Sequence, residues 1–584
     1  MCGILAIASP QAPIELSDAE IVAMRDILAH RGPDGSGLWR SPHAVLAHRR
    51  LAVLDPTSGS AQPMVRGSSV LAYNGELYNE QDLRLELARE GARFETNGDT
   101  ETVLLALRHW GTAALDRFRG MFALAYLDSE RGTILLARDP LGIKPLYWMR
   151  LDAQIVAASE IPALLAHPAA EPRPDLVGVS AYLSTIRTVL GSRTMFAGVR
   201  SLRPGESLEF DLLRPAAPRS RILDVGAMPS PPGHDELRAI VTESIQRHLR
   251  SDVPLCSLLS GGLDSTIIAA VAKREVGELR TYCAGAAGGE DFAHAARVAQ
   301  ELRTSHTEVL VTREAYLARW AALVREQGVP LSTPNEVAIH EVSRAMRARG
   351  EVVTLSGEGA DELFGGYAFA LAEAAKFHRE QGEKANPVEF ELASNAWVPS
   401  AVKGSMLTNE AWAAMEEDGA LRSAMGEAMA GAEGVEAHLT LHRRVNLPGL
   451  LQRLDSATMR ASVEGRTPLA DQRVFAAAMA YPIEALVDLD HPERATASKL
   501  PLRRAFAEVV PPEVVERPKA SFPLPFQAWC AGEGGRLLES EWLGRVVRGD
   551  VLAGVAADPE ANWRLAWPLL NLASWARCWF ERAR

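Results

Sequence analysis

A cysteine directly follows the initiator methionine, in the segment MCGILAIASP that opens the chain. A thiol at a mature amino terminus can act as a nucleophile with its own α-amine as general base, because an α-amine has a pKa of about 8. This chemistry requires removal of Met1, which the small Cys2 side chain permits. The alternative is that Cys2 only packs as a small apolar residue at the start of a buried strand.

A strand–loop–helix pattern with two adjacent glycines lies in CSLLSGGLDSTIIAAV, residues 256–271. We expect an apolar strand ending at Leu259, the loop 260–265, and then a helix. The glycines let the backbone approach a ligand, while serine hydroxyls and the helix N-terminus supply donors and partial positive charge. The loop lacks the GK[ST] ending of a Walker loop. It is predicted to bind an anion, and a purely structural turn is the alternative.

Carboxylates gather in the segment LSGEGADELFGGY, as Glu358, Asp361 and Glu362. Such close carboxylates repel one another unless a cation offsets their charge, and Mg²⁺ bridging phosphate oxygens is the natural candidate. A polar helix N-terminus with favourable acidic residues is the alternative interpretation. Farther on, ERPKASFP places Lys519 between a proline and an apolar Phe-Pro pair, where a lysine is better placed than most to lie in a cleft.

These motifs, with LDSATMRASVEGRTPLADQRV at residues 454–474, resemble those of the glutamine-dependent asparagine synthetases, whose synthetase domain is a PP-loop ATP pyrophosphatase. The resemblance implies ATP as a substrate, Mg²⁺ as its cofactor, and catalytic roles for Glu358 and Lys519. Asp264 and Asp361 are the implied metal ligands. The residues implied to contact ATP or pyrophosphate are Leu258, Ser260, Gly261, Gly262, Leu263, Asp264, Ser265, Ala284, Ser356 and Gly357.

Five motifs in the first half occur in the order and at the spacing of class II glutamine amidotransferases of the N-terminal nucleophile (Ntn) type: HRGPDGSG, HRRLAVLD, YNGELYN, NGDTETVL and RDPLGIKPLYW. The resemblance implies that Cys2 hydrolyses glutamine, and that Asn74 and the Gly75 backbone N–H form an oxyanion hole. It assigns the α-carboxylate of glutamine to Arg50 and its α-ammonium to Asp99. The residues implied to bind glutamine are Arg50, Leu51, Val53, Asn74, Gly75, Glu76 and Asp99.

The elements that must position these residues change in character along the chain. Residues 1–165 indicate a sheet-rich α+β pattern, and the Pro-, Gly- and Ser-rich segment 214–233 is predicted to be a linker. Strands then alternate with helices, which predicts a parallel sheet, and the chain after residue 368 is mostly helical. We predict a glutaminase domain over 2–213 and a synthetase domain over 234–584. With the resemblance, the expected fold is an α+β Ntn-hydrolase αββα sandwich followed by an α/β PP-loop domain with a helical C-terminal extension.

Length and composition limit the class of protein to which the chain can belong. The 584 residues predict two or more domains, and 47% hydrophobic with 23% charged residues is ordinary for a globular protein. The net charge of −12 argues against nucleic acid or an anionic membrane as partner, and no apolar run is long enough for a membrane span. The five cysteines are scattered, which predicts neither a disulfide framework nor a zinc site and favours a cytoplasmic location.

The resemblance implies a two-step reaction. Glutamine is hydrolysed at Cys2, ammonia crosses a mostly apolar tunnel, and ATP activates a carboxylate as its acyl-adenylate, so that AMP and pyrophosphate are released. Aspartate is the first expected acceptor. Because EGRTPLAD departs from the family's E-A-R-V-P-F-L-D and the loop 326–342 matches only loosely, another small-molecule, sugar or peptide carboxylate is the alternative. Pro501 is expected to end or kink a helix. A catalytically silent scaffold is the remaining class, and a homodimer is a family expectation.

Overall fold

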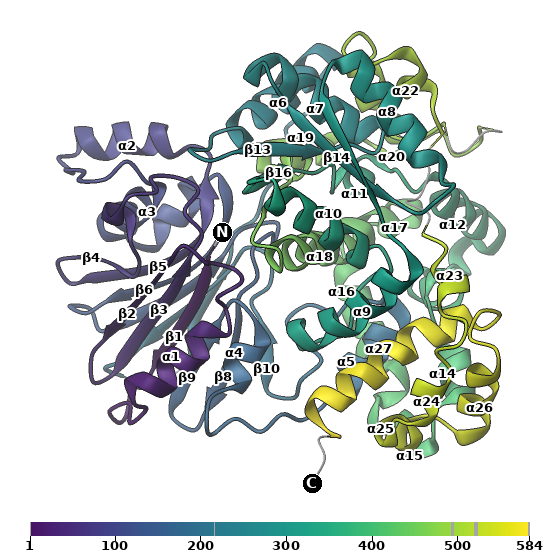
Figure 1. The fold of residues 1–584 in the computed structure, drawn as a ribbon, viewed down its shortest axis with the longest axis horizontal. Coiled ribbons are helices and arrows are strands. Elements are labelled where there is room, and N and C mark those ends of the chain that lie inside the picture. The colour runs from purple at the N-terminus through teal and green to yellow at the C-terminus, as the bar shows by residue number, and fades with distance from the viewer. Residues whose placement is uncertain (1, 215–216, 492–495, 519–523, 582–584) are drawn as a thin grey trace.

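Two six-stranded sheets face each other in the N-terminal region of the computed structural model (Figure 1), which describes residues 2–214, 217–491, 496–518 and 524–581. The first sheet has the order β10 (Val199–Ser201), β8 (Tyr147–Leu151), β9 (Gln154–Ala158), β1 (Gly3–Ala8), β3 (Ala44–Arg50) and β2 (Gly35–Arg40). The second has the order β12 (Arg219–Ile222), β11 (Glu206–Asp211), β7 (Thr133–Arg138), β6 (Gly120–Asp128), β5 (Ser69–Leu77) and β4 (Met64–Arg66).

Strand β1 shows why the sheets form two inner layers. All six of its residues are buried, and successive side chains of a strand point to opposite faces. Ile4 and Ala6 therefore join the core between the sheets, while Leu5 and Ile7 pack outward against helices α1 (Asp18–Asp26) and α4 (Ile161–Leu165). Helices α2 (Glu80–Arg89) and α3 (Asp99–Trp110) cover the second sheet. Ser17 caps α1 through a complete capping box with Glu20.

The predicted linker contains a strand. Residues 219–222 form β12, which pairs antiparallel with β11 at the edge of the second sheet. The sequence of this strand shows no hydrophobic alternation, because all four of its residues are exposed. Helix α6 (His234–His248) begins directly after the segment. The boundaries of the two domains stay predictions.

A five-stranded parallel sheet forms the centre of the second region, as the alternating pattern predicts. Its order is β15 (Ser305–Leu310), β14 (Arg280–Gly285), β13 (Leu255–Leu258), β16 (Val353–Leu355) and β17 (Glu464–Arg466). Helices α7 (Leu263–Val276), α8 (Glu290–Leu302), α9 (Arg313–Gln327) and α10 (Glu336–Ala348) lie between these strands in sequence. The mixed α/β content of the chain is therefore confirmed.

The rest of the described chain is mostly helical. The helices are α11 (Ala360–Phe364), α12 (Ala368–Gln381), α13 (Pro387–Phe390), α14 (Ser400–Met406), α15 (Asn409–Ala414), α16 (Gly419–Met429), α17 (Gly434–Leu441), α18 (Leu447–Met459), α19 (Gln472–Ala480), α20 (Ile483–Leu486), α21 (Leu500–Ala505), α22 (Pro512–Glu516), α23 (Phe526–Trp529), α24 (Gly535–Leu538), α25 (Glu541–Val546), α26 (Gly549–Ala557) and α27 (Trp563–Trp579). Pro501 lies in the first turn of α21 rather than in its interior, so the expected break is wrong. A first-turn proline lacks an N–H that would have no intrahelical partner anyway.

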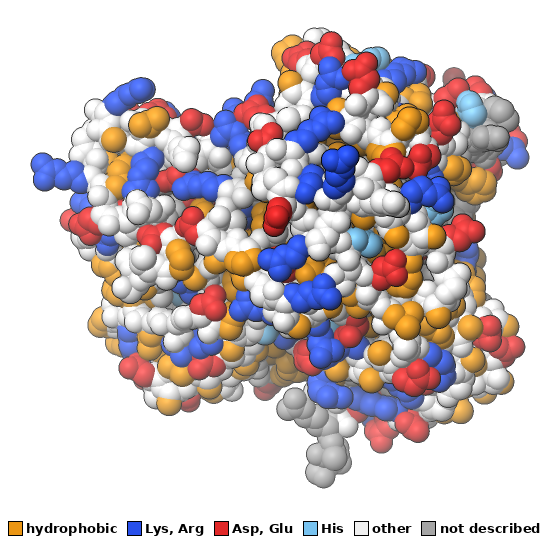
Figure 2. All heavy atoms as spheres, turned by 45° about the horizontal axis from the view of Figure 1, so that its top comes forward, with side chains coloured by type: hydrophobic (Ala, Val, Ile, Leu, Met, Phe, Trp, Pro, Cys, Tyr) orange, Lys and Arg blue, Asp and Glu red, His pale blue; other side chains and the backbone are white. Residues whose placement is uncertain are grey.

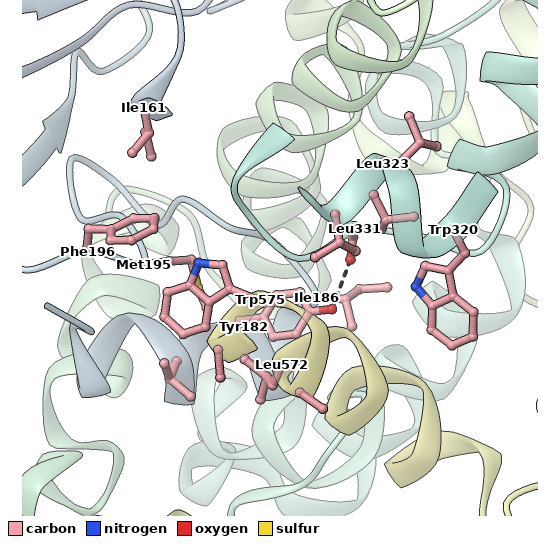
Figure 3. Packing of buried hydrophobic residues seen from close by; sticks show 14 of the residues in the cluster. Ile161, Tyr182, Ile186, Met195, Phe196, Trp320, Leu323, Leu331, Leu572 and Trp575 are labelled. Atoms are coloured by element: carbon pink, nitrogen blue, oxygen red, sulfur yellow. Dashed lines mark hydrogen bonds between the residues drawn. The ribbon is translucent and has the colours of Figure 1, made fainter. Parts of the chain in front are cut away.

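An apolar core joins the two regions (Figure 3). Tyr182, on α5 (Leu176–Thr185), donates a hydrogen bond of 2.9 Å to the carbonyl oxygen of Leu331, which follows α9. Trp320 of α9 stacks on Trp567 of the last helix, with ring centroids 4.5 Å apart. The long apolar helix α27 therefore packs against elements from both regions, and Figure 1 shows it beside α5 and α9.

The surface mixes both signs of charge. On the face shown in Figure 2, acidic and basic side chains are interspersed, with single apolar side chains between them. Within the described ranges, no helix is both long enough and apolar enough to cross a membrane.

Candidate functional site

Cys2 lies at the start of β1, where its side chain is 7% exposed. Its backbone nitrogen donates a hydrogen bond of 2.8 Å to Asn74 Oδ1, and its Sγ lies 3.9 Å from the carbonyl oxygen of Leu51. Burial raises the pKa of the Cys2 thiol above its ordinary value. The following glycine has a packing role, because a β-carbon at Gly3 would lie 2.6 Å from Leu28 Cβ.

The strand β5 presents Asn74 and Gly75 next to Cys2. Asn74 uses its carbonyl oxygen for Cys2, while its amide Nδ2 is buried and has no hydrogen-bond partner among the described residues. An unused buried donor is costly, which favours a ligand that accepts from it. A β-carbon at residue 75 would lie 2.3 Å from the carbonyl oxygen of Met121, so only glycine fits there.

The charged residues predicted to bind glutamine come from β3, β5 and α3. Arg50 donates to the backbone oxygens of Thr57 at 2.8 Å and Asp55 at 2.5 Å, which fixes its guanidinium beside the loop after β3. Asp99 accepts from the hydroxyl of Tyr73 at 3.1 Å and from a backbone N–H. Burial raises the pKa of Asp99 to about 6. Leu51 and Val53 are buried in the same loop.

Glu76 contacts the second region. Its Oε1 lies 3.3 Å from Arg466 Nη2, and Arg466 also donates 2.7 Å to Glu464 and 2.7 Å to the carbonyl oxygen of His248. Burial raises the pKa of Glu76 well above its usual range, while Arg466 works against this shift. We did not predict a role for Arg466, although it is the arginine of EGRTPLAD and matches the family's motif.

A second pairing links Cys2 to α18. Arg31 donates 3.1 Å to the carbonyl oxygen of Cys2 and 2.8 Å to Asp455, whose other oxygen lies 3.3 Å from Lys144 Nζ. The side chains of Arg31 and Lys144 are fully buried, and that of Asp455 is 1% exposed. The contacts that join the surroundings of Cys2 to the second region therefore include buried charges, beside the apolar cluster that Leu51 and Val53 form with Val353 and Met459. The ammonia tunnel stays a prediction.

The predicted phosphate loop connects β13 to α7. The strand ends at Leu258, one residue before the predicted end, and Gly262 is the N-cap residue of the helix. Gly261 has φ 71°, and a β-carbon there would lie 2.8 Å from the backbone of His294. Ser260 and Ser265 hydroxyls lie 3.1 Å apart within the loop.

The second signature follows β16 and lies against this loop. A β-carbon at Gly357 would lie 2.9 Å from Asp264 Cβ, so glycine permits the approach. Between the two carboxylates lies Lys499, whose Nζ is 2.5 Å from Asp264 Oδ2 and 2.7 Å from Asp361 Oδ1. Burial opposes the charge of Lys499, but Asp264 and Asp361 outweigh it and raise the pKa of the lysine. We did not predict Lys499; its only signal in the sequence is the lysine of SKLPLRRAF.

Glu358 and Glu362 have different partners. Glu358 forms an ion pair with Arg453 of α18, and Glu362 accepts from the hydroxyl of Tyr367. Burial, together with the neighbouring Asp361, raises the pKa of Glu362 to about 7. Within the described ranges, no three His, Cys, Asp or Glu side chains are grouped to hold a metal ion.

The remaining predicted residues lie around the phosphate loop, apart from one. Ser356 accepts from the backbone N–H of Glu358, and Ala284 is buried on β14 near Leu258. Lys519 lies outside the described residues.

The chain thus has two candidate sites: one around the buried thiol of Cys2 and one at the carboxyl ends of parallel strands. Two family models match these regions: a glutamine amidotransferase domain over residues 1–214 and an asparagine synthase domain over residues 236–577. This combination defines a glutamine amidotransferase fused to a synthetase, and it fits a glutamine-dependent, ATP-consuming enzyme that forms amides.

The chain is similar over nearly its full length to curated proteins. It is 32% identical over 635 residues to the putative asparagine synthetase [glutamine-hydrolyzing] of Mycobacterium tuberculosis H37Rv, with 97% of this chain and 93% of that protein covered. It is 28% identical over 559 residues to asparagine synthetase [glutamine-hydrolyzing] 3 of Bacillus subtilis, with 90% and 87% covered. It is 32% identical over 413 residues to asparagine synthetase B of Escherichia coli K12, with 66% and 68% covered. The chain belongs to the asparagine synthase family.

Proposed function

We propose that this enzyme converts aspartate to asparagine, using glutamine as nitrogen donor and ATP as energy source, and releases glutamate, AMP and pyrophosphate. The observation that carries the proposal is the hydrogen bond of 2.8 Å from the Cys2 backbone nitrogen to Asn74 Oδ1, which leaves the side-chain amide nitrogen Nδ2 of Asn74 buried and without a described partner. We assign the N-terminal region to the Ntn-type glutamine amidotransferases on the same grounds.

In the first half-reaction, Cys2 attacks the side-chain amide of glutamine once Met1 has been removed. The free α-amine of Cys2 takes the thiol proton and delivers it to the departing ammonia. Asn74 Nδ2 and the Gly75 N–H stabilise the oxyanion of the tetrahedral intermediate. Arg50 binds the α-carboxylate of glutamine and Asp99 its α-ammonium. Water then releases glutamate from the thioester.

In the second half-reaction, the acceptor carboxylate attacks the α-phosphorus of ATP and displaces pyrophosphate. The phosphate loop 260–265 and the start of α7 bind the phosphates. Asp264 and Asp361 come from the loops after two strands and lie on either side of Lys499. Their carboxylate oxygens are the ligands that Mg²⁺ prefers, so these two residues would hold Mg²⁺ in addition to pairing with the lysine. Mg²⁺ would offset charge on the phosphates. Lys499 and Lys519 provide further positive charge for pyrophosphate.

Ammonia then attacks the acyl-adenylate, and the carbonyl carbon gains a C–N bond as AMP leaves. Glu358 lies at the second signature and accepts the proton that ammonia loses. Its ion pair with Arg453 orients this carboxylate.

The test is product analysis with the purified full chain. With glutamine, ATP, Mg²⁺ and aspartate, we expect asparagine, glutamate, AMP and pyrophosphate in equal amounts. If AMP forms with a different carboxylic acid and not with aspartate, the assignment of aspartate as acceptor is wrong, while the class of enzyme still holds. If the protein neither hydrolyses glutamine nor forms AMP under any condition, the result favours the alternative of a catalytically silent scaffold protein.

A further inference from the structure

Two histidine side chains meet between helices α12 and α17. His378 of α12 and His438 of α17 bring their Nε2 atoms within 3.0 Å of each other. The ring centroids lie 5.2 Å apart, with an angle of 72° between the ring planes. The two helices pack against each other, and both are labelled in Figure 1. Neither histidine belongs to the glutamine site or to the ATP site, so the proposed function does not account for the pair.

Glu391 determines which nitrogen of His438 faces His378. Its Oε1 accepts a hydrogen bond of 2.6 Å from His438 Nδ1, and the side chains of Glu391 and His438 are only 7% and 1% exposed. An ionised carboxylate accepts and does not donate, so Nδ1 carries the hydrogen and Nε2 of the neutral ring presents a lone pair. Histidines that bind metal ions are oriented in this way, since their second ring nitrogen donates to a carboxylate or a carbonyl oxygen.

His378 supplies the second nitrogen and the access from solvent, because its side chain is half-buried. Burial, followed by the neighbouring His438, lowers the pKa of His378 below its ordinary value, so the ring is neutral at pH 7. Among the described residues, no lysine or arginine contributes to this shift. A cation between the two rings therefore meets no fixed positive charge from the described side chains around His378.

The spacing of the two nitrogens is close to what a tetrahedral metal ion needs. Zn²⁺ binds imidazole nitrogen at about 2.0–2.1 Å, so two of its ligands lie about 3.3–3.4 Å apart, and the rings need to separate by only about 0.3–0.4 Å. Binding replaces the hydrogen bond between the rings. The hydrogen on His378 Nε2 moves to Nδ1 of the same ring by exchange with water, so no net proton is released. Water takes the two remaining positions of the ion.

Apolar packing on both sides holds the helices at this spacing. Leu371 of α12 and Leu439 of α17 belong to one buried cluster. Leu441 of α17 belongs to another, together with Leu392, which follows Glu391. Ligands that are held in place by their surroundings lose little conformational entropy on binding, which favours even a site with two protein ligands.

We propose that His378 and His438 bind a divalent transition metal ion of the class that prefers imidazole, such as Zn²⁺, with Glu391 as the positioning carboxylate behind His438. Imidazole nitrogen suits Zn²⁺, Cu²⁺ and Ni²⁺, whereas Mg²⁺ takes oxygen ligands. The ion is therefore a different one from the Mg²⁺ of the ATP reaction. The proposal does not depend on which carboxylate the enzyme amidates.

The ion would hold α12 against α17 next to the second signature. Tyr367 directly precedes α12, and its hydroxyl donates to Glu362 of that signature. Its ring stacks on His442, which directly follows α17, with ring centroids 5.0 Å apart. A metal ion between the two helices therefore stabilises the pair of segments that carry this stack.

The test measures Zn²⁺ binding by calorimetry, and thermal unfolding with and without Zn²⁺, on the full chain without a histidine tag. The wild type is expected to bind Zn²⁺ and to unfold at a higher temperature in its presence, because an ion that binds only the folded chain stabilises it. Glu391→Gln retains the size of the side chain and is expected to lower the affinity by about 10-fold, whereas His378→Gln removes a ligand and is expected to lower it by at least about 100-fold. Excess Mg²⁺ should not compete.

His109→Gln is the matched control. His109 also pairs with a carboxylate, since its Nε2 lies 2.5 Å from Glu90, but it bonds to no other described histidine. The Zn²⁺ affinity and the rise in unfolding temperature should stay as in the wild type. Glutamine hydrolysis, measured without Zn²⁺, reports folding in every variant.

Each outcome bears on the site. Zn²⁺ binding that is lost in His378→Gln and retained in His109→Gln supports it. A wild type that binds no Zn²⁺ would overturn the proposal, and so would a His378→Gln variant that binds it as tightly as the wild type, because other groups would then hold the ion. An unchanged affinity in Glu391→Gln would remove Glu391 from the site. Asparagine formation is measured separately, so this proposal and the proposed function can fail independently.

Discussion

The glutamine site and the ATP site are assembled in different ways. The glutamine site takes Cys2, Asn74 and Asp99 from neighbouring strands and one helix, and each is less than 10% exposed. The ATP site takes Asp264 and Asp361 from loops at the ends of parallel strands, with side chains 19% and 24% exposed. Its central cation comes from Lys499, far along the chain. Close packing of two sheets holds the residues of the glutamine site in place. The ATP site at the strand ends is completed only when Lys499, which directly precedes α21, packs against it.

The largest expected effect separates the two sites completely. Cys2→Ala is expected to lower glutamine hydrolysis by at least about 10³-fold, since it removes the nucleophile. Ammonia-dependent AMP formation is expected to stay within twofold of wild type. Both rates are measured on one preparation. Residual glutaminase activity near the wild-type level would show that another group attacks glutamine.

The converse variant is Lys499→Met. We expect ammonia-dependent AMP formation to fall by about 10²–10³-fold, because a buried cation that faces transition-state charge is removed. The loss also leaves Asp264 and Asp361 repelling each other. Glutamine hydrolysis serves as the internal control and should be unchanged. Lys499→Arg retains charge with a different shape, and recovery of full activity in it would show that charge alone suffices.

A third variant tests whether the two sites are independent. Asp455→Ala leaves the buried cations Arg31 and Lys144 without their shared partner, so we expect a loss of about 3–5 kcal/mol in the free energy of unfolding. Chemical denaturation measures it. Because Arg31 also holds the carbonyl oxygen of Cys2, glutamine hydrolysis should fall as well. A stability loss with normal glutaminase activity would show that the pairing is only structural.

The smallest effect concerns pH. Burial raises the pKa of Asp99 to about 6, and the carboxylate must be charged to bind the ammonium of glutamine. As the pH falls below this value Asp99 becomes neutral, so the KM for glutamine should rise about tenfold per pH unit. The KM for ATP in the ammonia-dependent reaction serves as the comparison. Asp99→Asn should have a high KM that no longer changes in this range.

Short motifs allowed the strands, the phosphate loop and the family to be predicted, because the residues of each motif lie close together in the sequence. Cys2, Asn74 and Asp99 were predicted from such motifs, and the structure places them together. Lys499 was missed because a lone lysine before a helix carries no pattern, and only the folded chain brings it to Asp264.

Other residues were missed for a different physical reason. Arg453 and Arg466 act as buried cations paired with Glu358 and Glu76, and burial of a charge cannot be deduced from sequence spacing. Strand β12 was assigned to a linker because its exposed polar residues have no hydrophobic alternation. The roles of the site residues stay predictions until the variants are measured.

The shared carboxylate of Asp455 has a consequence for dividing the protein. A chain cut after β12, at residue 223, yields two polypeptides, one with Arg31 and Lys144 and the other with Asp455. Each fragment alone exposes charges that the intact chain neutralises, together with its own part of the apolar core in Figure 3. Such fragments should be poorly soluble apart and should bind each other when co-expressed. Split versions of this enzyme would therefore work as obligate heterodimers rather than as two independent catalysts.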